Sequence, residues 1–223
     1  IKVCKFDINY FNYSAIVNYG VECSNGEYIV MLNNDIEFIT EDWIEQLLMY
    51  AQRPDVGICG AKLYFPDRSI QHAGVTLGTR GLAGHRCREV QEKDFKKDDY
   101  INIVQDLSAV TAACFMVRKQ LYIDMLGFDE KLAVAFNDVD FCMKIRTAKY
   151  LIVYNPFVEA YHYESKSRGE DTENTEKQKR FAKEYELFVK RWSKVIAKGD
   201  PYYNKNYRLD TDLPKINYNK ISY

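Results

Sequence analysis

The pattern of hydrophobic and polar positions predicts strands that alternate with helices along most of the chain. Short apolar or alternating runs predict strands at 1–6, 28–32, 36–38, 56–65, 108–118, 151–154 and 158–163. Apolar positions at helical spacing predict helices at 14–23, 41–52, 119–126, 137–150 and 173–197. Strands separated by helices are typical of an α/β sheet with crossover connections.

Single residues indicate where several of these elements begin or end, or how deeply they are buried. Ser14 is expected to cap the first helix and Thr40 the second, and Gly127 is expected to end the third. The run 28–32 is continuously apolar, which predicts a strand buried on both faces. Residues 66–104 are less periodic and predict an inserted hairpin followed by a long loop.

The last predicted helix carries one apolar stripe, formed by Phe181, Tyr185, Phe188, Trp192, Val195 and Ile196. Such a stripe favours packing against the parent domain, and a helix lying on a membrane surface is the alternative. From Asp200 onward the chain is polar and rich in Tyr and Asn, which predicts an extended arm.

Composition and charge narrow the class of protein. The 223 residues carry 31 Lys and Arg against 32 Asp and Glu, so the formal net charge is -1 and no nucleic-acid partner held by bulk charge is expected. The six cysteines form no CxxC pair and three lie in apolar runs, which predicts buried thiols in a reducing, cytoplasmic compartment. The longest apolar stretch, 109–117, is too short to cross a bilayer.

The first candidate site follows the apolar run 28–32. Asn33, Asn34 and Asp35 come directly after it, and ligands of open α/β sheets gather outside the carboxyl ends of strands. Oxygen ligands at that place suit a hard divalent cation, which in turn can hold a diphosphate. The alternative is an ordinary turn, because Asn and Asp favour turns for local hydrogen-bonding reasons.

The second candidate is a pair of carboxylates, Asp138 and Asp140, at a predicted helix start. Residues two apart on a helix point to nearly opposite sides, so only one of the pair can face a site. That one could act as a general base, while the other stabilises the helix. The alternative is that both carboxylates serve only the helix dipole.

The third candidate is His162, which lies in a strand-like run and is followed by a polar segment with Lys166 and Arg168. An imidazole suits a manganese-type ion, and the two cationic side chains suit phosphate oxygens. The alternative is a half-buried histidine beside a solvated loop. Only His72 and His85 remain as further histidines, so a histidine-rich zinc site is not expected.

The order of these candidates resembles a known family. An acidic strand end, a helix-start aspartate and a later histidine are similar to the GT-A fold of nucleotide-diphospho-sugar transferases. The chain resembles family-2 glycosyltransferases of bacterial polysaccharide assembly, and most closely the O-antigen rhamnosyltransferase-like group. The strings that carry the resemblance run from about residue 11 to residue 204: FNYSAIVNYGV, GEYIVMLNND, IQHAGVTLG, AGHRCR, SAVTAACFMVRK, GFDEKLAVAFNDVDFCMKIR, PFVEAYHYESKSRG and DPYYN.

The resemblance implies a role for each candidate residue. Asn33-Asn34-Asp35 occupies the place of the DXD motif, with Asp35 and His162 as metal ligands for Mn²⁺ or Mg²⁺ and with Asn33 in place of the usual first acid. Asp138 falls at the catalytic-base position of the xED motif, where Asn137 replaces the common Glu. The positions expected to contact the nucleotide or its diphosphate are Asn18, Asn33, Asn34, Lys166 and Arg168.

The resemblance also implies a domain plan. Residues 1–170 correspond to the C-terminal two-thirds of a GT-A catalytic domain with a mixed sheet flanked by helices, and 171–223 to the amphipathic helix and the arm. Family members begin with further strand-helix units that bind the base and ribose, and these are expected to be missing from this chain. A sheet edge left open in this way could pair with a second copy.

The expected function is inverting transfer of a sugar from a nucleotide-diphosphate donor to a saccharide or lipid-linked saccharide acceptor, in bacterial polysaccharide synthesis. Peripheral contact with the inner face of the cell membrane and homo-oligomerisation are further expectations. The alternative from another class is a non-catalytic glycosyltransferase-like module that binds glycan or organises a synthesis complex. A nucleotidyltransferase is disfavoured because no Gly-rich phosphate loop is present.

Overall fold

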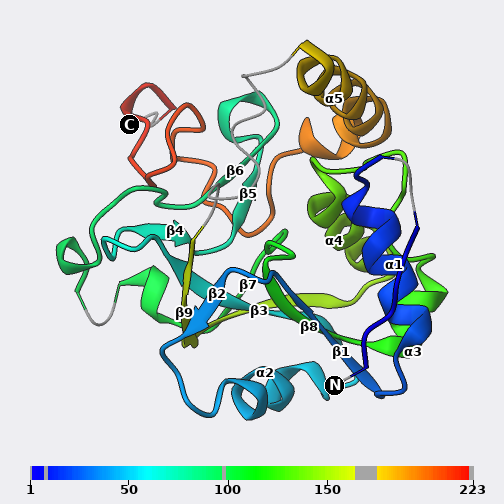
Figure 1. The fold of residues 1–223 in the computed structure, drawn as a ribbon. Helices are drawn as coiled ribbons and strands as arrows, with labels where there is room; N and C mark the ends of the chain where they lie inside the picture. The colour runs from blue at the N-terminus through cyan, green and yellow to red at the C-terminus, as the bar shows by residue number, and fades with distance from the viewer. Residues whose placement is uncertain (1, 8–9, 97–98, 164–174, 221–223) are drawn as a thin grey trace.

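The computed structural model describes residues 2–7, 10–96, 99–163 and 175–220. One mixed sheet crosses the molecule, with helices on both faces (Figure 1). Its main path runs β1 (Tyr28–Leu32), β8 (Cys114–Arg118), β3 (Val56–Tyr64), β9 (Leu151–His162) and β2 (Ile36–Phe38). β4 (Ile70–His72) adds to β3, and β7 (Gln105–Asp106) adds to β9. The expected α/β class with a mixed sheet is confirmed.

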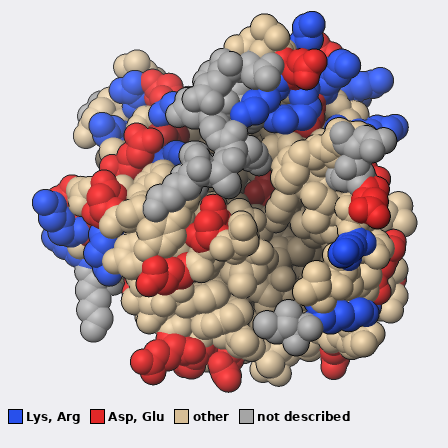
Figure 2. Space-filling model, viewed as in Figure 1, with Lys and Arg blue, Asp and Glu red and all other residues tan. Residues whose placement is uncertain are grey.

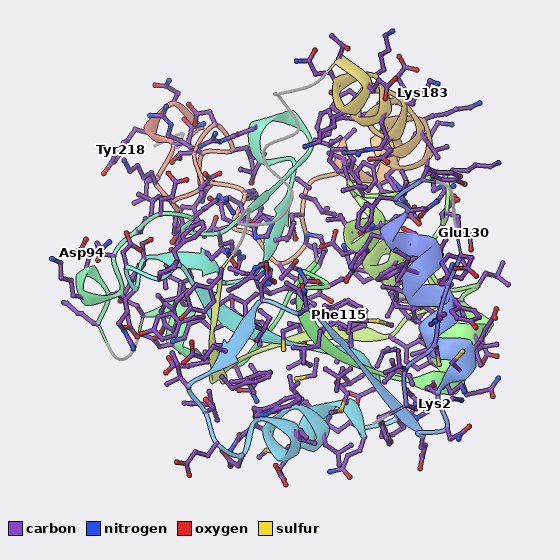
Figure 3. The ribbon with its side chains drawn as sticks, viewed as in Figure 1. Lys2, Asp94, Phe115, Glu130, Lys183 and Tyr218 are labelled. Carbon is purple, nitrogen blue, oxygen red and sulfur yellow. The ribbon has the colours of Figure 1, made fainter. Side chains whose placement is uncertain are left out.

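Among the described strands of this sheet, the central pair β3 and β9 runs parallel and the other pairs are antiparallel. All nine residues of β3 are buried, so this strand forms the middle of the core. Because successive side chains of a strand point to opposite faces, Ile58 and Cys59 enter different hydrophobic clusters. In β8, Phe115 likewise enters the cluster of Ile58, and Met116 enters the cluster of Cys59. Phe115 lies near the middle of the molecule (Figure 3).

The two clusters correspond to two layers of helix. α2 (Trp43–Ala51) covers one face alone, where Leu47 packs against the Cys59 side of the sheet. α1 (Tyr13–Cys23), α3 (Lys119–Asp124) and α4 (Asn137–Thr147) lie on the other face, around a group of aromatic rings (Figure 1). That group contains Phe115, Tyr122, Phe128 and Phe141, whose ring centroids lie 4.9–6.5 Å apart.

Two expected strands differ in the structure. Residues 2–7 form no strand; they run beside α1, where Phe6 stacks on Tyr19 with centroids 4.9 Å apart and Lys2 Nζ donates to the carbonyl of Cys23. The alternating pattern alone does not produce a strand here, because no neighbouring strand pairs with this segment among the described residues. β1 is formed as expected, but only Met31 is buried, since β1 is an outer strand of the described sheet and not a central one.

The two short strands expected on either side of Asn155-Pro156 are one strand, β9. The chain passes the proline by a shift of register against β3, between Ala61 and Lys62. The buried Asn155 side chain replaces the lost ladder contacts: its Nδ2 donates to the carbonyl of Gln46 and its Oδ1 accepts from the amide of Phe157. The irregularity therefore ties β9 to α2.

The expected helix caps also differ. Asn12 caps α1, with its Oδ1 3.0 Å from the amide of Ala15, while Ser14 lies inside the helix and donates to the carbonyl of Leu132. α2 begins at Trp43, and the Thr40 hydroxyl instead donates to the carbonyl of Phe157. Gly127 does end the α3 region, where its φ of +57° suits a residue without a Cβ atom.

The segment after β4 contains the expected hairpin, β5 (Val75–Leu77) with β6 (Ala83–His85), as a separate two-stranded sheet. α5 (Thr175–Ile196) follows β9 and packs on α4, as the apolar stripe predicted. After α5 the chain folds back over the hairpin in a series of turns; Asp200 accepts from the amide of Leu77 and the hydroxyl of Ser108. The division of the chain at residue 170 stays a prediction.

Candidate functional site

The side chains predicted from three distant parts of the sequence meet in one pocket of about 620 Å³. Asp35 comes from the connection between β1 and β2, His162 from the end of β9, and Asp138 from the first turn of α4. Asn33 and Asn34 line the same pocket. The convergence results from the sheet topology, because β2 pairs with the end of β9 and places Ile36 opposite His162.

One wall of the pocket is formed by Asp35 and His162, with His162 Nε2 3.1 Å from Asp35 Oδ1. The other ring nitrogen, Nδ1, lies 2.6 Å from Oε1 of Gln71, a carbonyl oxygen that can only accept. This contact places a proton on Nδ1 and turns Nε2 toward Asn33 Nδ2, 3.2 Å away, and toward Asp35. Nε2 is thus the ring nitrogen that faces the Asp35 carboxylate.

Asp35 Oδ1 is buried and has no hydrogen-bond partner among the described residues. A buried carboxylate oxygen without a donor is costly, and a divalent cation at this place would satisfy it. The described residues contain no group of three or more His, Cys, Asp or Glu side chains that could hold a metal. The chain therefore fits a cation as a two-residue site whose remaining ligands come from elsewhere, as in sites completed by substrate phosphates.

Asp138 lines the pocket from the first turn of α4. Its Oδ2 accepts from the amide of Ala112 and its Oδ1 from the amide of Val139 at 2.7 Å. The buried Asn137 anchors the start of the helix, since its Nδ2 donates to Ser14 Oγ and to the carbonyl of Val134. The positive end of the α4 dipole favours a negative charge at this place.

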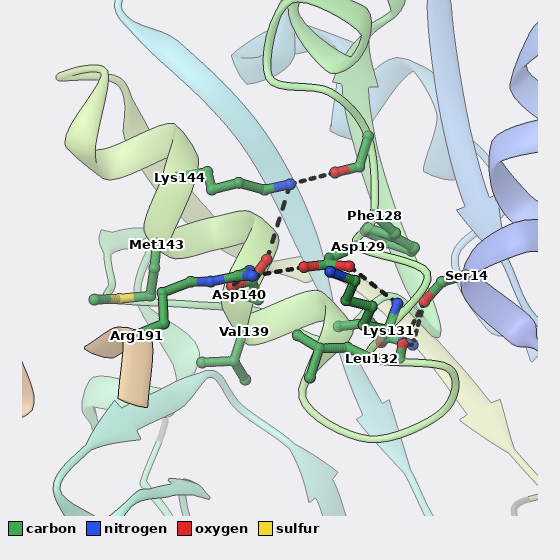
Figure 4. Close-up of polar contacts among 12 residues, drawn as sticks. Ser14, Phe128, Asp129, Lys131, Leu132, Val139, Asp140, Met143, Lys144 and Arg191 are labelled. Atoms are coloured by element: carbon green, nitrogen blue, oxygen red, sulfur yellow. Dashed lines mark hydrogen bonds and ion pairs between the residues drawn. The ribbon is translucent and has the colours of Figure 1, made fainter. Parts of the chain in front are cut away.

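Asp140 points the other way, as its spacing from Asp138 predicts. It is fully buried, and its Oδ1 accepts from Arg191 at 2.6 Å (Figure 4). The same oxygen accepts from Trp192 Nε1 of α5 at 2.8 Å. Lys144 lies 3.8 Å from Oδ2, and burial lowers the pKa of this lysine. Asp140 thus joins two helices, and only Asp138 of the pair reaches the pocket.

The structure adds pocket residues that the sequence reasoning missed. Tyr13 donates its hydroxyl to Asn33 Oδ1, and Lys177 and Arg180 reach the pocket from the first turns of α5. Basic side chains gather over α5 on this face of the molecule (Figure 2). The sequence did contain a partial indication of the two basic residues. Lys177 and Arg180 are three positions apart on the predicted helix and therefore lie on the same side of it.

One predicted contact residue within the described part of the chain, Asn18, does not line the pocket. Asn18 lies on α1, where its side chain accepts from Tyr122 and from the amide of Phe128, and so holds the loop after α3. That placement gives Asn18 no contact with the pocket, so its predicted nucleotide-side role has no geometric support. Lys166 and Arg168 lie outside the described residues.

His72 and His85 form a separate pair behind the pocket, with their Nδ1 atoms 2.9 Å apart. His72 is fully buried, and this burial lowers its pKa well below the ordinary value, so the ring is neutral. Its Nε2 accepts from the amide of Thr111, a residue that lines the pocket. These contacts match a structural role for His72.

All six cysteines are free, and those in apolar runs are buried as expected: Cys59, Cys114 and Cys142. Burial raises the pKa of each of these thiols. Within the described part of the chain, no helix has both the length and the apolar character needed to cross a bilayer.

The chain is similar to several known proteins. It is 43% identical over 206 residues to the protein y4gI of Sinorhizobium fredii, covering 92% of this chain and 22% of that protein. It is 33% identical over 201 residues to the O-antigen biosynthesis protein RfbC of Myxococcus xanthus, covering 89% and 15% respectively. A Mycobacterium tuberculosis N-acetylglucosaminyl-diphospho-decaprenol L-rhamnosyltransferase is 23% identical over 153 residues, 65% of this chain and 50% of that enzyme.

A solved structure has the same fold. The chain superposes with a TM-score of 0.60 on the crystal structure of GalNAc-T7 with UDP, GalNAc and Mn²⁺, at 12% identity, covering 83% of this chain and 36% of that one. The expected GT-A fold is confirmed by this likeness. The chain spans less than a quarter of y4gI and of RfbC, so it corresponds to one part of those larger proteins.

The sequence profile named Glycosyl transferase family 2 matches residues 1–126, which include β1, the Asn33–Asp35 connection and β8. α4 with Asp138, the end of β9 with His162, and α5 lie beyond the matched residues. The match covers more than half of the chain, and the chain belongs to glycosyl transferase family 2.

Proposed function

We propose that the chain carries the catalytic centre of an inverting, metal-dependent glycosyltransferase of bacterial polysaccharide or O-antigen synthesis. The observation that supports this most directly is the shared pocket of Asp35, His162 and Asp138, which lie far apart in the sequence. The names of the relatives add the substrate class: RfbC acts in O-antigen biosynthesis, and the mycobacterial enzyme is a rhamnosyltransferase with a diphospho-lipid acceptor.

Asp35 and His162 would hold the cation on the donor side. A bound Mn²⁺ or Mg²⁺ would neutralise the charge that develops on the nucleoside diphosphate as it leaves. Asn33 supports this wall, since its amide group contacts both His162 and the Tyr13 hydroxyl. Lys177 and Arg180 line the same pocket and would add positive charge for phosphate oxygens.

Asp138 would accept the proton of the acceptor hydroxyl. Its carboxylate faces the pocket and is held by the amides of Ala112 and Val139, so it does not need to reorganise when the acceptor binds. The acceptor oxygen then attacks the anomeric carbon from the face opposite the leaving diphosphate, which inverts the configuration. The sugar moves from the diphosphate oxygen to the acceptor oxygen, and the proton moves to Asp138.

The acceptor would approach over α5. Lys183, Lys190 and Lys194 are exposed on this helix, and Lys183 points away from the molecule (Figure 3). An exposed basic row beside the pocket is complementary to anionic lipid headgroups. Peripheral contact with an anionic leaflet would bring a lipid-linked saccharide to the pocket, and co-sedimentation with phosphatidylglycerol vesicles, absent with phosphatidylcholine, is the expected result.

The test of the proposed function compares Asp138→Asn with Asp124→Asn in the full chain. Asp124 is an exposed carboxylate at the end of α3, so it serves as the matched control. Turnover is measured as nucleoside diphosphate released from UDP-sugars and nucleoside-diphosphate rhamnose, with a diphospho-lipid-linked N-acetylglucosamine analogue as acceptor and Mn²⁺ present. Loss of a general base predicts a fall in kcat of about 10²–10⁴-fold for Asp138→Asn.

Normal turnover by Asp138→Asn would defeat the assignment of the base. Titration of the unmodified chain with Mn²⁺ and UDP separates the proposal from its alternative. Binding of UDP that depends on Mn²⁺ is expected for the enzyme. Glycan binding without metal-dependent binding of UDP or turnover would instead favour the non-catalytic module.

A further inference from the structure

The loop that precedes Asp138 is held by a buried carboxylate of α5. Glu184 is 2% exposed, and its two oxygens accept from consecutive backbone amides, Oε1 from Val134 at 3.2 Å and Oε2 from Ala135 at 2.8 Å. Both amides belong to the short loop between Leu132 and the first turn of α4. The amide of Ala135, which Glu184 holds, is therefore only three positions before Asp138 in the chain.

The next residue of the loop, Phe136, has a backbone conformation that needs external support. Its φ is 64°, in the left-handed region that a bulky side chain rarely adopts. The ring is held by aromatic side chains of α5, with centroids 5.5 Å from Phe181, 6.2 Å from Tyr185 and 5.1 Å from Phe188. The same helix thus fixes the amides before Phe136 and the side chain of Phe136 itself.

The far side of the loop is fixed by α1. Ser14 Oγ donates to the carbonyl of Leu132, and the amide of Tyr13 donates to the carbonyl of Ala133. α1 donates to the carbonyls of the loop, and Glu184 of α5 accepts from its amides. The two helices together therefore position the loop that leads into Asp138. Removal of the α5 contacts frees the side of the loop nearer to Asp138.

We propose that Glu184 is a positioning residue for catalysis, which sets the place of Asp138 through the amides of Val134 and Ala135. This proposal rests on the proposed function, since it gives Asp138 the role of base. It makes α5 part of the catalytic centre although this helix lies beyond the residues matched by the family profile. α5 then has two tasks, because Lys177 and Arg180 line the pocket from its first turns.

Glu184 is suited to this task because it is a carboxylate. A carboxylate offers two acceptor oxygens, whereas an amide side chain offers one oxygen and an NH₂ group that would face a backbone N–H. Arg180 lies 3.6 Å from Oε1 and helps to offset the buried charge. Burial raises the pKa of Glu184, while the loop amides favour its ionised form.

The experiment compares Glu184→Gln with Glu186→Gln, its matched control, which is exposed on the same helix two residues away. Hydrogen–deuterium exchange of the segment 130–140, the turnover assay with its pH profile, and Mn²⁺–UDP titration are measured on the full chain. For E184Q we expect faster exchange at 133–136 and a fall in kcat of about 10–100-fold, since small misplacement of a catalytic group costs this much. The affinity for Mn²⁺ should stay within about twofold, because the contacts of Glu184 are with Val134, Ala135 and Arg180 and not with Asp35 or His162.

A changed shape of the kcat–pH profile is the readout that a merely structural role would not produce. A destabilised enzyme has a smaller active fraction, which scales kcat at every pH alike, whereas a displaced Asp138 titrates in a new environment. E186Q should match the unmodified chain in every measurement. Unchanged kcat in E184Q would overturn the proposal, and so would a lower kcat with unchanged exchange and an unchanged pH profile.

The Asp138→Asn variant keeps the two proposals distinguishable. If it turns over normally, the proposed function fails; if it is inactive while E184Q behaves like the control, only the positioning role fails. Should E184Q not fold, Glu184→Asp retains the charge but is too short to reach both amides at once. It is expected to give the same pattern with a smaller loss, and unchanged kcat in E184D would overturn the proposal.

Discussion

A histidine ring can bind a cation through only one of its nitrogens, so the partner of the other nitrogen decides how well it does so. In this pocket Gln71 is that partner for His162, through the 2.6 Å contact between Oε1 and Nδ1. Gln71 also donates from Nε2 to the backbone carbonyl of His162, so it fixes the residue at two points. Gln71 therefore sets the orientation of the ring that His162 turns toward Asp35.

Gln71→Leu should lower the affinity for Mn²⁺ in the presence of UDP by about 10–100-fold, as loss of such supporting contacts does at other metal sites. The leucine removes the acceptor for Nδ1–H, so the ring can rotate or change its tautomer. Calorimetric titration of Mn²⁺ measures the effect. Gln120→Leu, on the exposed side of α3, is the control. Equal Mn²⁺ affinities of the two variants would contradict this account of His162.

At the residue scale the sequence predicted three side chains that line one pocket but not the groups that hold them. Asp35, Asp138 and His162 stand at recognisable places, a strand end, a helix start and a late strand. Gln71 and Glu184 act on partners 91 and about 50 positions away. No local pattern records such a contact, because it exists only after β4 pairs with β3 and α5 packs on α4.

At the element scale α5 is joined to the core by charge as well as by its apolar stripe. Arg191 donates to the fully buried Asp140 and to Asp129, at 2.6 Å in both cases (Figure 4). Arg191→Ala removes both contacts and leaves Asp140 with Trp192 Nε1 as its hydrogen-bond donor among the described side chains. A buried acceptor that loses a donor costs about 1–3 kcal/mol, and the free energy of unfolding should fall by that amount.

Urea denaturation followed by circular dichroism measures the loss, with Lys190→Ala as the control. Lys190 is the exposed neighbour of Arg191, so its removal should change the free energy of unfolding by less than about 0.5 kcal/mol. A loss in Arg191→Ala no larger than in the control would show that Asp140 does not depend on this arginine.

The elements that the sequence predicted well are those whose pattern reflects burial by their immediate neighbours. β3 is buried throughout and is the central strand, and Phe188 and Trp192 of the α5 stripe are buried in the core. The segment 2–7 and β1 show where prediction from the hydrophobic pattern fails. Both patterns are compatible with a central strand, but the strand order decides whether neighbours exist on both sides, and the order depends on contacts between distant segments.

At the scale of the whole molecule, the question is whether the sheet and α5 unfold together. The two tryptophans report on opposite sides of the sheet: Trp43 stacks on Phe38 beside α2, with centroids 3.9 Å apart, and Trp192 is buried against α4. The contacts of Glu184, Arg191 and Trp192 with the α4 region join α5 to the same core. We therefore expect one cooperative transition in the full chain, without separate unfolding of the part after residue 170.

Two single-tryptophan variants test this expectation. In Trp43→Phe the fluorescence reports on α5, and in Trp192→Phe it reports on the α2 side. In each variant the urea midpoint from fluorescence should coincide with the midpoint from circular dichroism of the same protein, so the hydrogen bond lost in Trp192→Phe does not affect the comparison. If Trp192 fluorescence changes at lower urea than circular dichroism in Trp43→Phe, α5 detaches first, and the chain divides near residue 170 into two cooperative units.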